Sequence, residues 1–363
     1  MGVLVAMSGG VDSSVAAFLM SEKYKNDCVG ATMLLFLNET LNIPAYNKYP
    51  CCSRENIIDA KKICDTLGIK HEILNFMADF EEHVIKNFID TYENGGTPNP
   101  CIACNKFLKF GLMLEHSEKL GLGNVATGHY AKIERDNSGR YLLRKAKDLH
   151  RDQSYVLYML TQKILSRVEF PLGDMTKPEV RELAASLNFS NSQKHDSQDI
   201  CFIPDGNYAS FIENYTGKKY PEGNFVDPNG KILGTHKGII HYTAGQRRGL
   251  GVSAATRLYV SEIDAVNNKI ILVPEDDSNL YFKYITVEKA NLIALDKIEN
   301  YLKARVKIRY HQNEIPAKIF QTGESSFLIE FDTPQIAPAK GQSAVIYDDD
   351  YVIGGGIISQ AKN

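Results

Sequence analysis

The stretch Val3 to Ser14, VLVAMSGGVDSS, joins a short apolar strand to a Gly-Gly turn and the start of a helix. Gly9 and Gly10 let the backbone approach an anion closely, and the hydroxyl and carboxylate side chains around them add polar contacts. At the beginning of a helix, backbone N–H groups point at such an anion. The stretch therefore predicts a phosphate-binding loop.

This loop lacks the two commonest phosphate-binding patterns. It has neither the Gly-x4-Gly-Lys-Ser/Thr of a Walker A motif nor the Gly-x-Gly-x-x-Gly of a dinucleotide fingerprint. Its SGGxDS pattern after an N-terminal strand resembles the pyrophosphate loop (PP-loop) of ATP pyrophosphatases. These enzymes cleave ATP between the α- and β-phosphates and adenylate a substrate. A glycine-rich turn that only caps a helix is the alternative at this point.

The composition narrows the class of protein. The chain has 363 residues, 44% of them hydrophobic, and is too long for one compact domain. It has no signal-peptide pattern and no apolar run of membrane-spanning length, so we expect a cytoplasmic protein without a membrane partner. A net charge of -3 means that any nucleic acid must be held by local basic patches. Seven cysteines in such a protein favour thiol chemistry or metal binding over structural disulfides.

Short apolar strands alternate with amphipathic helices in the first part of the chain. Strands are expected at residues 3–7, 28–36, 71–75 and 124–127, and helices at 13–21, 56–67 and 80–92. This alternation predicts a doubly wound parallel sheet. The resemblance of the loop to the PP-loop implies a sheet of the adenine nucleotide alpha hydrolase type. Ligands of such sheets bind beyond the carboxyl ends of the strands, which would bring the glycine loop, Met33 and Gly128 around one crevice.

The pattern changes after about Pro204 to short alternating segments separated by Gly, Pro, Asn and Asp, which predict β-hairpins. From about Tyr284 onward, evenly spaced apolar runs suggest a small antiparallel barrel. We therefore expect a catalytic domain at 1–204, a central β-rich domain at 205–283 and a C-terminal β-barrel at 284–363.

Two segments carry candidate reactive thiols, TPNPCIACNKFLKFG at 97–111 and HDSQDICFI at 195–203. A single cysteine is more often a small buried hydrophobe than a nucleophile. The TPNP leader opposes a helix across 97–100 and is expected to present the following cysteines on an exposed loop edge. Cys104 would then precede a helix start, where the helix dipole and Lys106 lower the pKa of a thiol. Cys201 is the second candidate.

Seven separated motifs occur in one order and together resemble the family of tRNA-specific 2-thiouridylases, the MnmA/TrmU family. The resemblance covers nearly the whole chain, from Met1 to the GQSAV and GGGII segments near Gln342 and Ile357. The motifs are SGGVDSS, TPNPxxxCNxxxKF, ATGHYA, DQSYxLY, DSQDICFI, HYTxGQRRGLG and KIRY.

The resemblance implies an enzyme that replaces the O2 oxygen of the wobble uridine in tRNA with sulfur. ATP with Mg2+ would adenylate O2, and a persulfide on Cys201 would then supply the sulfur. That sulfur would come from a cysteine desulfurase or a sulfur-relay protein, and Cys104 would end in a disulfide with Cys201. The residues that would bind ATP are Ala6, Met7, Ser8, Gly9, Gly10, Val11, Asp12, Ser13, Met33 and Gly128.

The target-base motif departs from the family pattern. Asn99, Pro100 and Cys101 would line the pocket for the base, but many members carry Asp where Cys101 stands, so a general-acid role is in doubt there. The change also creates a Cys101-x2-Cys104 pair. With Cys201 it could ligate an iron-sulfur cluster, although two independent thiols is the plainer interpretation.

Contacts to the anticodon region of tRNA are expected at two basic segments. Lys303, Arg305, Lys307 and Arg309 alternate with apolar residues, which gives a strand one cationic face. The family places tRNA contacts at the positions of Arg309 and Tyr310. The second segment is the basic group Arg144, Lys145, Lys147 and Arg151, which precedes Asp152 and Gln153. The family pattern carries Lys where Arg151 stands, and Arg keeps the charge, so Arg151, Asp152 and Gln153 are also expected contacts. Gln246, Arg247 and Arg248 either contact RNA or only turn a hairpin.

Two other functions remain open from the sequence. A related PP-loop enzyme would adenylate a small molecule, but it needs neither the two cysteines nor a basic strand. A binding module for ATP and RNA without catalysis would keep Cys104 and Cys201 as inert core residues.

Overall fold

The computed structural model describes residues 2–37, 54–194 and 200–363. Residue contacts divide the chain into two compact units. Unit 1 comprises residues 1–84, 101–207 and 350–352, and unit 2 comprises 85–100, 208–349 and 353–363. Within the described part of the chain, no helix has the length and apolar character needed to cross a membrane.

Unit 1 is built on a five-stranded sheet with the order β3-β2-β1-β4-β7, in which every neighbouring pair is parallel. The predicted doubly wound parallel sheet is confirmed. The strands are β1 (Gly2–Ala6), β2 (Cys28–Leu34), β3 (Lys70–Asn75), β4 (Gly123–Ala126) and β7 (Val168–Glu169).

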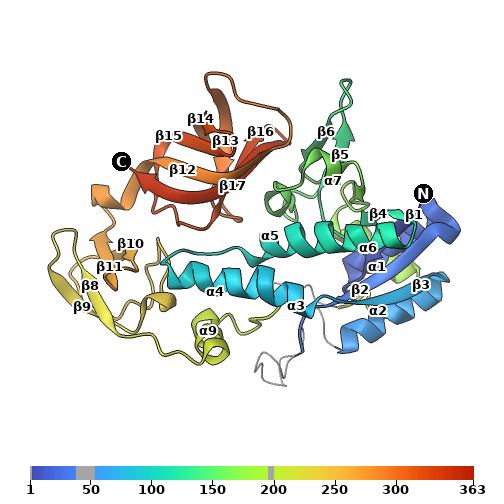
Figure 1. Ribbon diagram of the computed structural model, residues 1–363, viewed down its shortest axis with the longest axis horizontal. Coiled ribbons are helices and arrows are strands. Elements are labelled where there is room, and N and C mark those ends of the chain that lie inside the picture. The colour runs from blue at the N-terminus through green and yellow to red at the C-terminus, as the bar shows by residue number, and fades with distance from the viewer. Residues whose placement is uncertain (1, 38–53, 195–199) are drawn as a thin grey trace. The chain divides into compact units, whose positions relative to one another are not determined.

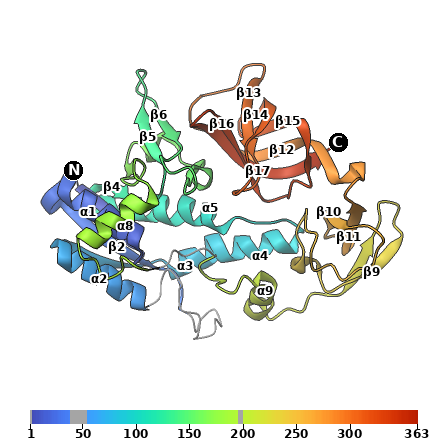
Figure 2. The same ribbon diagram turned by 180° about the vertical axis from the view of Figure 1, so that it is seen from behind.

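Helices cover both faces of this sheet (Figures 1 and 2). Helix α1 (Val11–Tyr24) packs against α2 (Arg54–Leu67) and α8 (Lys177–Ser186), whereas α6 (Met113–Lys119) packs against β1 and β4. Val3 and Val5 of β1 belong to the core under α1, and both are fully buried. A short 3-10 turn, η1 (Lys25–Asp27), joins α1 to β2.

Two longer helical runs differ from the expected pattern. The first joins α3 (Met77–Phe80) to a π-helical segment at Glu81–Ile85 and to α4 (Lys86–Glu93), of which α4 belongs to unit 2. The second joins α5 (Pro100–Cys104) to a π-helical segment at Asn105–Leu112 and to α6. The expectation that Cys101 and Cys104 lie on a loop edge is therefore wrong. Pro100 opens the helix, because proline fits the first helical position, where its missing N–H is not needed.

Unit 1 also contains short elements that the sequence did not indicate. Strands β5 (Lys132–Arg135) and β6 (Tyr141–Arg144) form an antiparallel hairpin. Arg144 and Leu143 of this hairpin pair with Tyr351 and Val352, which the residue contacts assign to unit 1. A 3-10 turn, η4 (Ser154–Leu157), and α7 (Gln162–Leu165) lead from the hairpin to β7.

Unit 2 begins its long segment with α9 (Tyr208–Thr216), where only hairpins were expected. A four-stranded sheet follows, with the order β10-β11-β8-β9. The predicted hairpins appear as the antiparallel pairs β8 with β9 and β10 with β11. The elements are β8 (Gly223–Val226), β9 (Ile232–His236), η5 (Ile239–His241), β10 (Leu258–Asp264), β11 (Lys269–Pro274) and η6 (Ser278–Leu280).

Six strands of unit 2 form a closed antiparallel barrel, as predicted (Figure 1). The order is β12-β15-β14-β13-β16-β17, and pairing of β12 with β17 closes it. Alternate residues such as Val306, Ile319 and Phe331 point into its core and are fully buried. The strands are β12 (Tyr281–Leu292), β13 (Leu302–Lys307), β14 (Ile315–Gly323), β15 (Ser326–Ile336), β16 (Ser343–Asp348) and β17 (Tyr351–Lys362).

Candidate functional site

The glycine loop lies between β1 and α1, as the sequence predicts. The Ser13 hydroxyl donates to the Gly10 carbonyl at 3.0 Å and accepts the backbone N–H of Ser8 at 3.2 Å. Gly10 is the N-cap of the 14-residue helix α1 and provides no side-chain cap. The helix therefore presents its first N–H groups and the positive end of its dipole at the loop, where both favour an anion.

Glycine is required at two positions of this site because another backbone passes within contact distance. Gly9 has a φ of +73°, and a Cβ there would lie 2.4 Å from the carbonyl oxygen of Asn56. Gly128, just after β4, faces the loop itself. A Cβ at Gly128 would lie 2.9 Å from the carbonyl carbon of Asp12 and 3.0 Å from the nitrogen of Ser13.

The residues expected at the nucleotide thus gather at the carboxyl edge of the sheet. Met33 lies in β2, two residues beyond Ala31, which pairs with Ala6 of β1. Around the loop, Ser8 is exposed, Ala6, Gly10 and Asp12 are half-buried, and Met7, Gly9, Val11 and Ser13 are buried.

The carboxylate of Asp12 is held by two side chains from later in the chain. Lys177 donates to Oδ1 and to Oδ2 of Asp12, at 2.8 Å each. The Tyr130 hydroxyl donates to Oδ1 at 2.8 Å. The Lys177 side chain is only 8% exposed, whereas that of Asp12 is 31% exposed. In this ion pair the Lys177 ammonium group is therefore largely shielded from water, whereas the Asp12 carboxylate is partly accessible.

A second group of side chains forms hydrogen bonds to the carbonyl group of Gly9 in the loop. Asn191 donates from Nδ2 to the Gly9 carbonyl at 3.1 Å and to the Ser14 hydroxyl at 2.9 Å. Lys194 donates to the Gly9 carbonyl at 3.4 Å and to Asp59 at 3.0 Å. Both side chains precede residues 195–199, which lie outside the described residues.

The His129 ring of the ATGHYA motif is a buried structural group. Its Nδ1 lies 2.7 Å from the Thr127 hydroxyl, and its ring contacts Phe110 and Phe170. Burial, with Lys109 nearby, holds the pKa of His129 well below its usual value. The ring is therefore neutral at physiological pH and packs as an uncharged group.

Cys104 occupies the end of α5 and is 8% exposed, so its thiol is buried rather than on the surface. The next residue, Asn105, donates from Nδ2 to the Val156 carbonyl at 3.0 Å. This bond joins the Cys104 helix to the DQSYVLY segment. Cys101, one turn earlier in α5, is exposed. The two thiols therefore have different surroundings.

Cys201 is half-buried and directly precedes two core residues. Phe202 is 1% exposed and packs edge-to-face on Phe80, with ring centroids 5.6 Å apart. Phe80 in turn contacts Phe36, which follows the carboxyl end of β2. These rings fix the segment after Cys201 beside the edge of the sheet that also carries the glycine loop.

The described residues do not support the predicted cluster ligands. Within 2–37, 54–194 and 200–363, no group of three or more His, Cys, Asp or Glu side chains is placed to hold a metal ion. Cys101, Cys104 and Cys201 all fall within these ranges. Cys101, Cys104 and Cys201 therefore do not form such a group in this structure.

The backbone before the target-base motif is fixed within unit 2. Gln342 donates from Nε2 to the carbonyls of Thr97 and Pro98, at 3.2 and 3.1 Å. The Thr97 N–H donates to the Lys340 carbonyl at 2.7 Å. The turn after β15 thus sets the path of the chain into Asn99, which is half-buried.

The predicted tRNA residues of unit 1 lie in an ordered loop. Asp152 accepts the Ala146 N–H at 3.0 Å and the Ser154 hydroxyl at 2.6 Å. Gln153 accepts the Tyr130 N–H at 3.0 Å through Oε1. These side chains shape the loop from within and leave Arg151 exposed at its surface.

The predicted tRNA residues of unit 2 likewise include both exposed side chains and side chains that form hydrogen bonds within the protein. Lys303 and Arg305 are exposed on β13, whereas Val306 is buried, as the alternation predicts. Arg309 donates from Nη2 to the carbonyls of Ile336 and Ala337, at 3.1 Å each. Tyr310 and the basic residues Arg247 and Arg248 complete this set. Tyr310 is half-buried, whereas Arg247 and Arg248 are exposed. Gln246 stabilises the turn before them, because its Oε1 accepts the Thr243 N–H at 3.0 Å.

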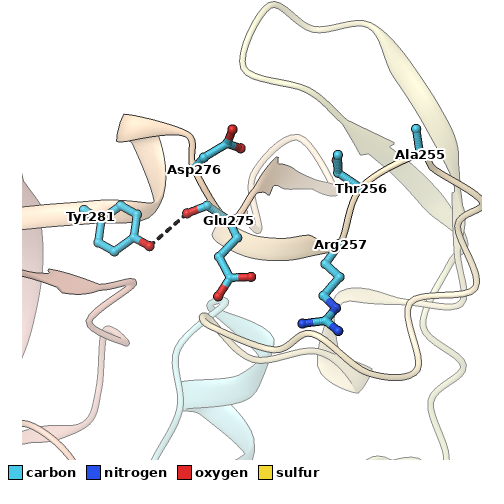
Figure 3. A pocket seen from close by; sticks show the side chains of 6 residues that line it. All are labelled: Ala255, Thr256, Arg257, Glu275, Asp276 and Tyr281. Carbon is cyan, nitrogen blue, oxygen red and sulfur yellow. Dashed lines mark hydrogen bonds between the residues drawn. The ribbon is translucent and has the colours of Figure 1, made fainter.

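Unit 2 also has an open hollow of about 650 Å³ that contains no predicted site residue (Figure 3). It is lined by Ala255, Thr256, Arg257, Glu275, Asp276 and Tyr281. Figure 3 shows the side chains of Arg257 and Glu275 pointing to the same side, while the Tyr281 hydroxyl donates to the Glu275 carbonyl at 2.8 Å.

Three family models match the chain in succession. They are the tRNA methyl transferase HUP domain over residues 1–205, the tRNA methyl transferase PRC-barrel domain over 209–274, and the aminomethyltransferase β-barrel domain over 282–358. A protein named tRNA-specific 2-thiouridylase MnmA from Clostridioides difficile is 44% identical over 99% of this chain and 98% of its own length. The chain belongs to the MnmA family.

Other MnmA relatives agree with this assignment. The protein of that name from Halothermothrix orenii is 44% identical over 99% of each chain, and that from Acetivibrio thermocellus is 45% identical over 98% of each. The resemblance inferred from the ordered motifs is confirmed.

The structure adds site residues that the sequence did not single out. Lys177, Tyr130, Asn191 and Lys194 all contact the glycine loop or its first helical turn. Tyr130 lies within the ATGHYA motif, and Lys194 directly precedes the segment that contains Cys201. Their positions next to recognised motifs could therefore have identified these two residues from the sequence. Lys177 lies in TKPEVRELA, which the sequence indicates only as a capped helix start.

We expect Gly128→Ala to weaken MgATP binding by about tenfold or more, because the added methyl group must push back the Asp12–Ser13 backbone. Calorimetric titration with MgATP measures this. Gly234→Ala serves as a control for the general effect of substituting glycine, because Gly234 has no positive φ and a Cβ there would meet only side-chain atoms, the nearest at 3.3 Å on Val252. Equal MgATP affinity of Gly128→Ala and the unmodified protein would contradict the placement of the nucleotide.

Iodoacetamide at neutral pH should modify Cys101 at least about tenfold faster than Cys28 or Cys64. Cys101 is exposed, whereas burial raises the pKa of the Cys28 thiol to about 11 and that of Cys64 to about 12. Mass spectrometry of proteolytic peptides after timed quenching measures the three rates. Comparable rates for all three would show that the core around β2 opens readily.

Gln342→Ala should raise the KM for tRNA severalfold while MgATP affinity stays unchanged. The substitution removes both hydrogen bonds that fix Thr97 and Pro98 before the base motif. Steady-state thiolation with varied tRNA measures the effect, and the exposed Gln360→Ala is the matched control. An unchanged KM for tRNA would show that this turn does not influence recognition.

Proposed function

We propose that the protein is an ATP-dependent tRNA-uridine 2-sulfurtransferase that converts the wobble uridine of tRNA to 2-thiouridine. Its membership of the MnmA family supports this function, and so does an anion-binding loop at the carboxyl edge of a parallel sheet. The reaction then has two parts, activation of the uracil O2 and delivery of sulfur.

In the first part, O2 of the uridine attacks the α-phosphorus of ATP. The bond between the α- and β-phosphates breaks, AMP becomes attached to O2, and pyrophosphate leaves. The positive end of α1 and the backbone of residues 8–13 favour the negative charge that develops on the leaving group. Met33 and Gly128 are proposed to lie near the adenosine part of ATP.

Magnesium enters this step as part of the MgATP substrate, and it offsets phosphate charge when bound. Asp12 is the acidic residue of the loop, and both of its carboxylate oxygens already accept hydrogen bonds from Lys177. The loop therefore supplies backbone donors and hydroxyls in this structure, with its carboxylate committed to the lysine.

In the second part, the terminal sulfur of a Cys201 persulfide attacks C2, and AMP departs with the former O2. The Cys104 thiolate then attacks the Cys201 sulfur, which releases 2-thiouridine and leaves a Cys104–Cys201 disulfide. An external reductant opens this disulfide before the next turnover. In the alternative order, Cys104 first releases hydrosulfide, which then attacks C2.

The packing around both cysteines supports their assignment. Asn105 holds the Cys104 helix to the segment of Val156, and Phe202 holds the chain after Cys201 to Phe80. Both cysteines belong to unit 1, the unit that contains the glycine loop. The observation that carries the proposal is this combination of two thiols and a phosphate loop in one folded unit.

Recognition of tRNA is assigned to the target-base motif and to residues of the two basic segments. The wobble base must leave the anticodon stack to expose O2, and Asn99, Pro100 and Cys101 would line its pocket. Cys101 would contact the base without acting as a general acid. Arg151, Asp152, Gln153, Arg309 and Tyr310 are the proposed contacts to the rest of the anticodon region.

Two further assignments belong to this proposal. The persulfide sulfur would come from a cysteine desulfurase or a sulfur-relay protein. The three-part division at 1–204, 205–283 and 284–363 would separate nucleotide chemistry from the β-rich parts that help to hold tRNA.

Cys104→Ser and Cys201→Ser should each lower formation of 2-thiouridine by at least about a hundredfold, because each removes one sulfur of the transfer. Mass analysis of tRNA nucleosides after incubation with MgATP and a desulfurase measures the product. MgATP and tRNA affinities should remain within about threefold of those of the unmodified protein.

Cys28→Ala, which removes a buried thiol of β2, is the control for loss of a cysteine as such. Continued thiolation by either serine variant would refute the assigned role of that cysteine. Full binding with no product from the unmodified protein would favour a module that binds ATP and RNA without catalysis.

A further inference from the structure

We propose that Lys177 is the built-in counter-ion of Asp12 and acts as a positioning residue for the nucleotide loop. The inference rests on the proposed function, since it takes residues 8–13 as the site of the ATP phosphates. It assigns a role to a lysine far along the chain that no motif of the loop contains.

A carboxylate at this position poses an electrostatic problem. Asp12 lies in the first turn of α1, whose N-terminus is the part of the loop best suited to an anion. The triphosphate of ATP carries several negative charges, and an uncompensated carboxylate nearby would repel it. The loop can bind a polyphosphate well only if the charge of Asp12 is offset.

The positive charge of Lys177 offsets the negative charge of Asp12 at short distance. Its ammonium group lies 2.8 Å from each carboxylate oxygen of Asp12. The lysine side chain is 8% exposed, so water screens the pair weakly on that side. The Tyr130 hydroxyl adds a neutral donor at 2.8 Å and fixes the carboxylate orientation.

The position of Lys177 is itself fixed by the start of α8. Thr176 caps this helix through a reciprocal capping box with Glu179. The Lys177 N–H donates to Asp148 at 2.9 Å. Helix α8 also packs along α1, which carries Asp12. The ammonium group is therefore presented to the loop by a rigid element, with little freedom to leave it.

This role differs from that of an ordinary structural ion pair. If the pair served stability alone, breaking it would lower the unfolding temperature and leave nucleotide affinity unchanged in the folded protein. If Lys177 instead offsets Asp12 for the polyphosphate, the loss of affinity depends on the charge left on Asp12. Removing that charge as well should then restore binding.

The experiment is a calorimetric titration of the full chain with MgATP in the absence of tRNA. Lys177→Met should weaken binding by about tenfold to a hundredfold, because it leaves a partly buried carboxylate beside the phosphates. Asp12→Asn measured alone shows how much Asp12 itself contributes to MgATP affinity. The double variant Asp12→Asn with Lys177→Met should bind MgATP at least about fivefold more tightly than Lys177→Met, because the charge that Lys177 offsets is then absent. Lys177→Arg, which keeps the charge, should be intermediate.

Lys61→Met is the matched control, because Lys61 forms an ion pair with Asp65 on α2 in which both side chains are more than 60% exposed, at 62% and 61%. It should leave MgATP affinity unchanged. The deficit of Lys177→Met should also shrink when the salt concentration is raised, since screening weakens the repulsion. Thermal unfolding of each variant separates loss of fold from loss of affinity. If Lys177→Met does not fold, the neutral double variant alone decides by binding or not binding MgATP.

Asp12→Asn as weak as Lys177→Met, with no recovery in the double variant, would overturn the inference and assign Asp12 a direct contact with MgATP. Unchanged affinity of folded Lys177→Met would overturn it in favour of a stabilising ion pair. Failure of the unmodified protein to bind MgATP would instead refute the adenylation step of the proposed function.

Discussion

The shape of the phosphate-binding loop in unit 1 depends on two glycines, each of which lies in close contact with the backbone of another segment. Gly9 passes within contact distance of the Asn56 carbonyl, and Gly128 meets the backbone between Asp12 and Ser13. Without side chains at these points, the segments after β1 and β4 can close on one another and direct the first N–H groups of α1 into one place. The adenylation step of the proposed chemistry needs this geometry, because the leaving pyrophosphate must be held while O2 is being adenylated, and sulfur transfer follows only after that step.

Segments far apart in sequence maintain that geometry. Tyr130 and Lys177 hold the carboxylate of Asp12, while Asn191 and Lys194 hold the carbonyl of Gly9 from behind. A loop rich in glycine loses much conformational entropy when it becomes ordered, so external hydrogen bonds are needed to keep one conformation. Lys194 lies close in sequence to Cys201. The chain that supports the loop thus continues directly into the segment proposed to carry the sulfur.

The parts that sequence predicts well are those governed by local patterns. Apolar runs identify β1 to β4 and the barrel strands, and the Gly-Gly turn identifies the loop, because periodicity and backbone freedom are local properties. The helix start at Pro100 was mispredicted because proline both disfavours a preceding helix and suits the first helical position. The partnership of Lys177 with Asp12 was not predictable, since a lysine at a capped helix start is usually solvated. Only the packing of α8 on α1 brings the two charges together.

The point at which the residue contacts divide unit 2 from unit 1 falls at the start of one short helix. Thr97 and Pro98 are fixed by Gln342 within unit 2, whereas Cys104 belongs to unit 1. Helix α5 begins at Pro100, the last residue that the contacts assign to unit 2, and ends at Cys104. Cys101 and Cys104, both in unit 1, therefore lie on one helix rather than on a loop. The TPNP pattern thus leads into a helix rather than an exposed loop, because Pro100 suits the first helical position, and the helix fixes the separation of Cys101 from Cys104.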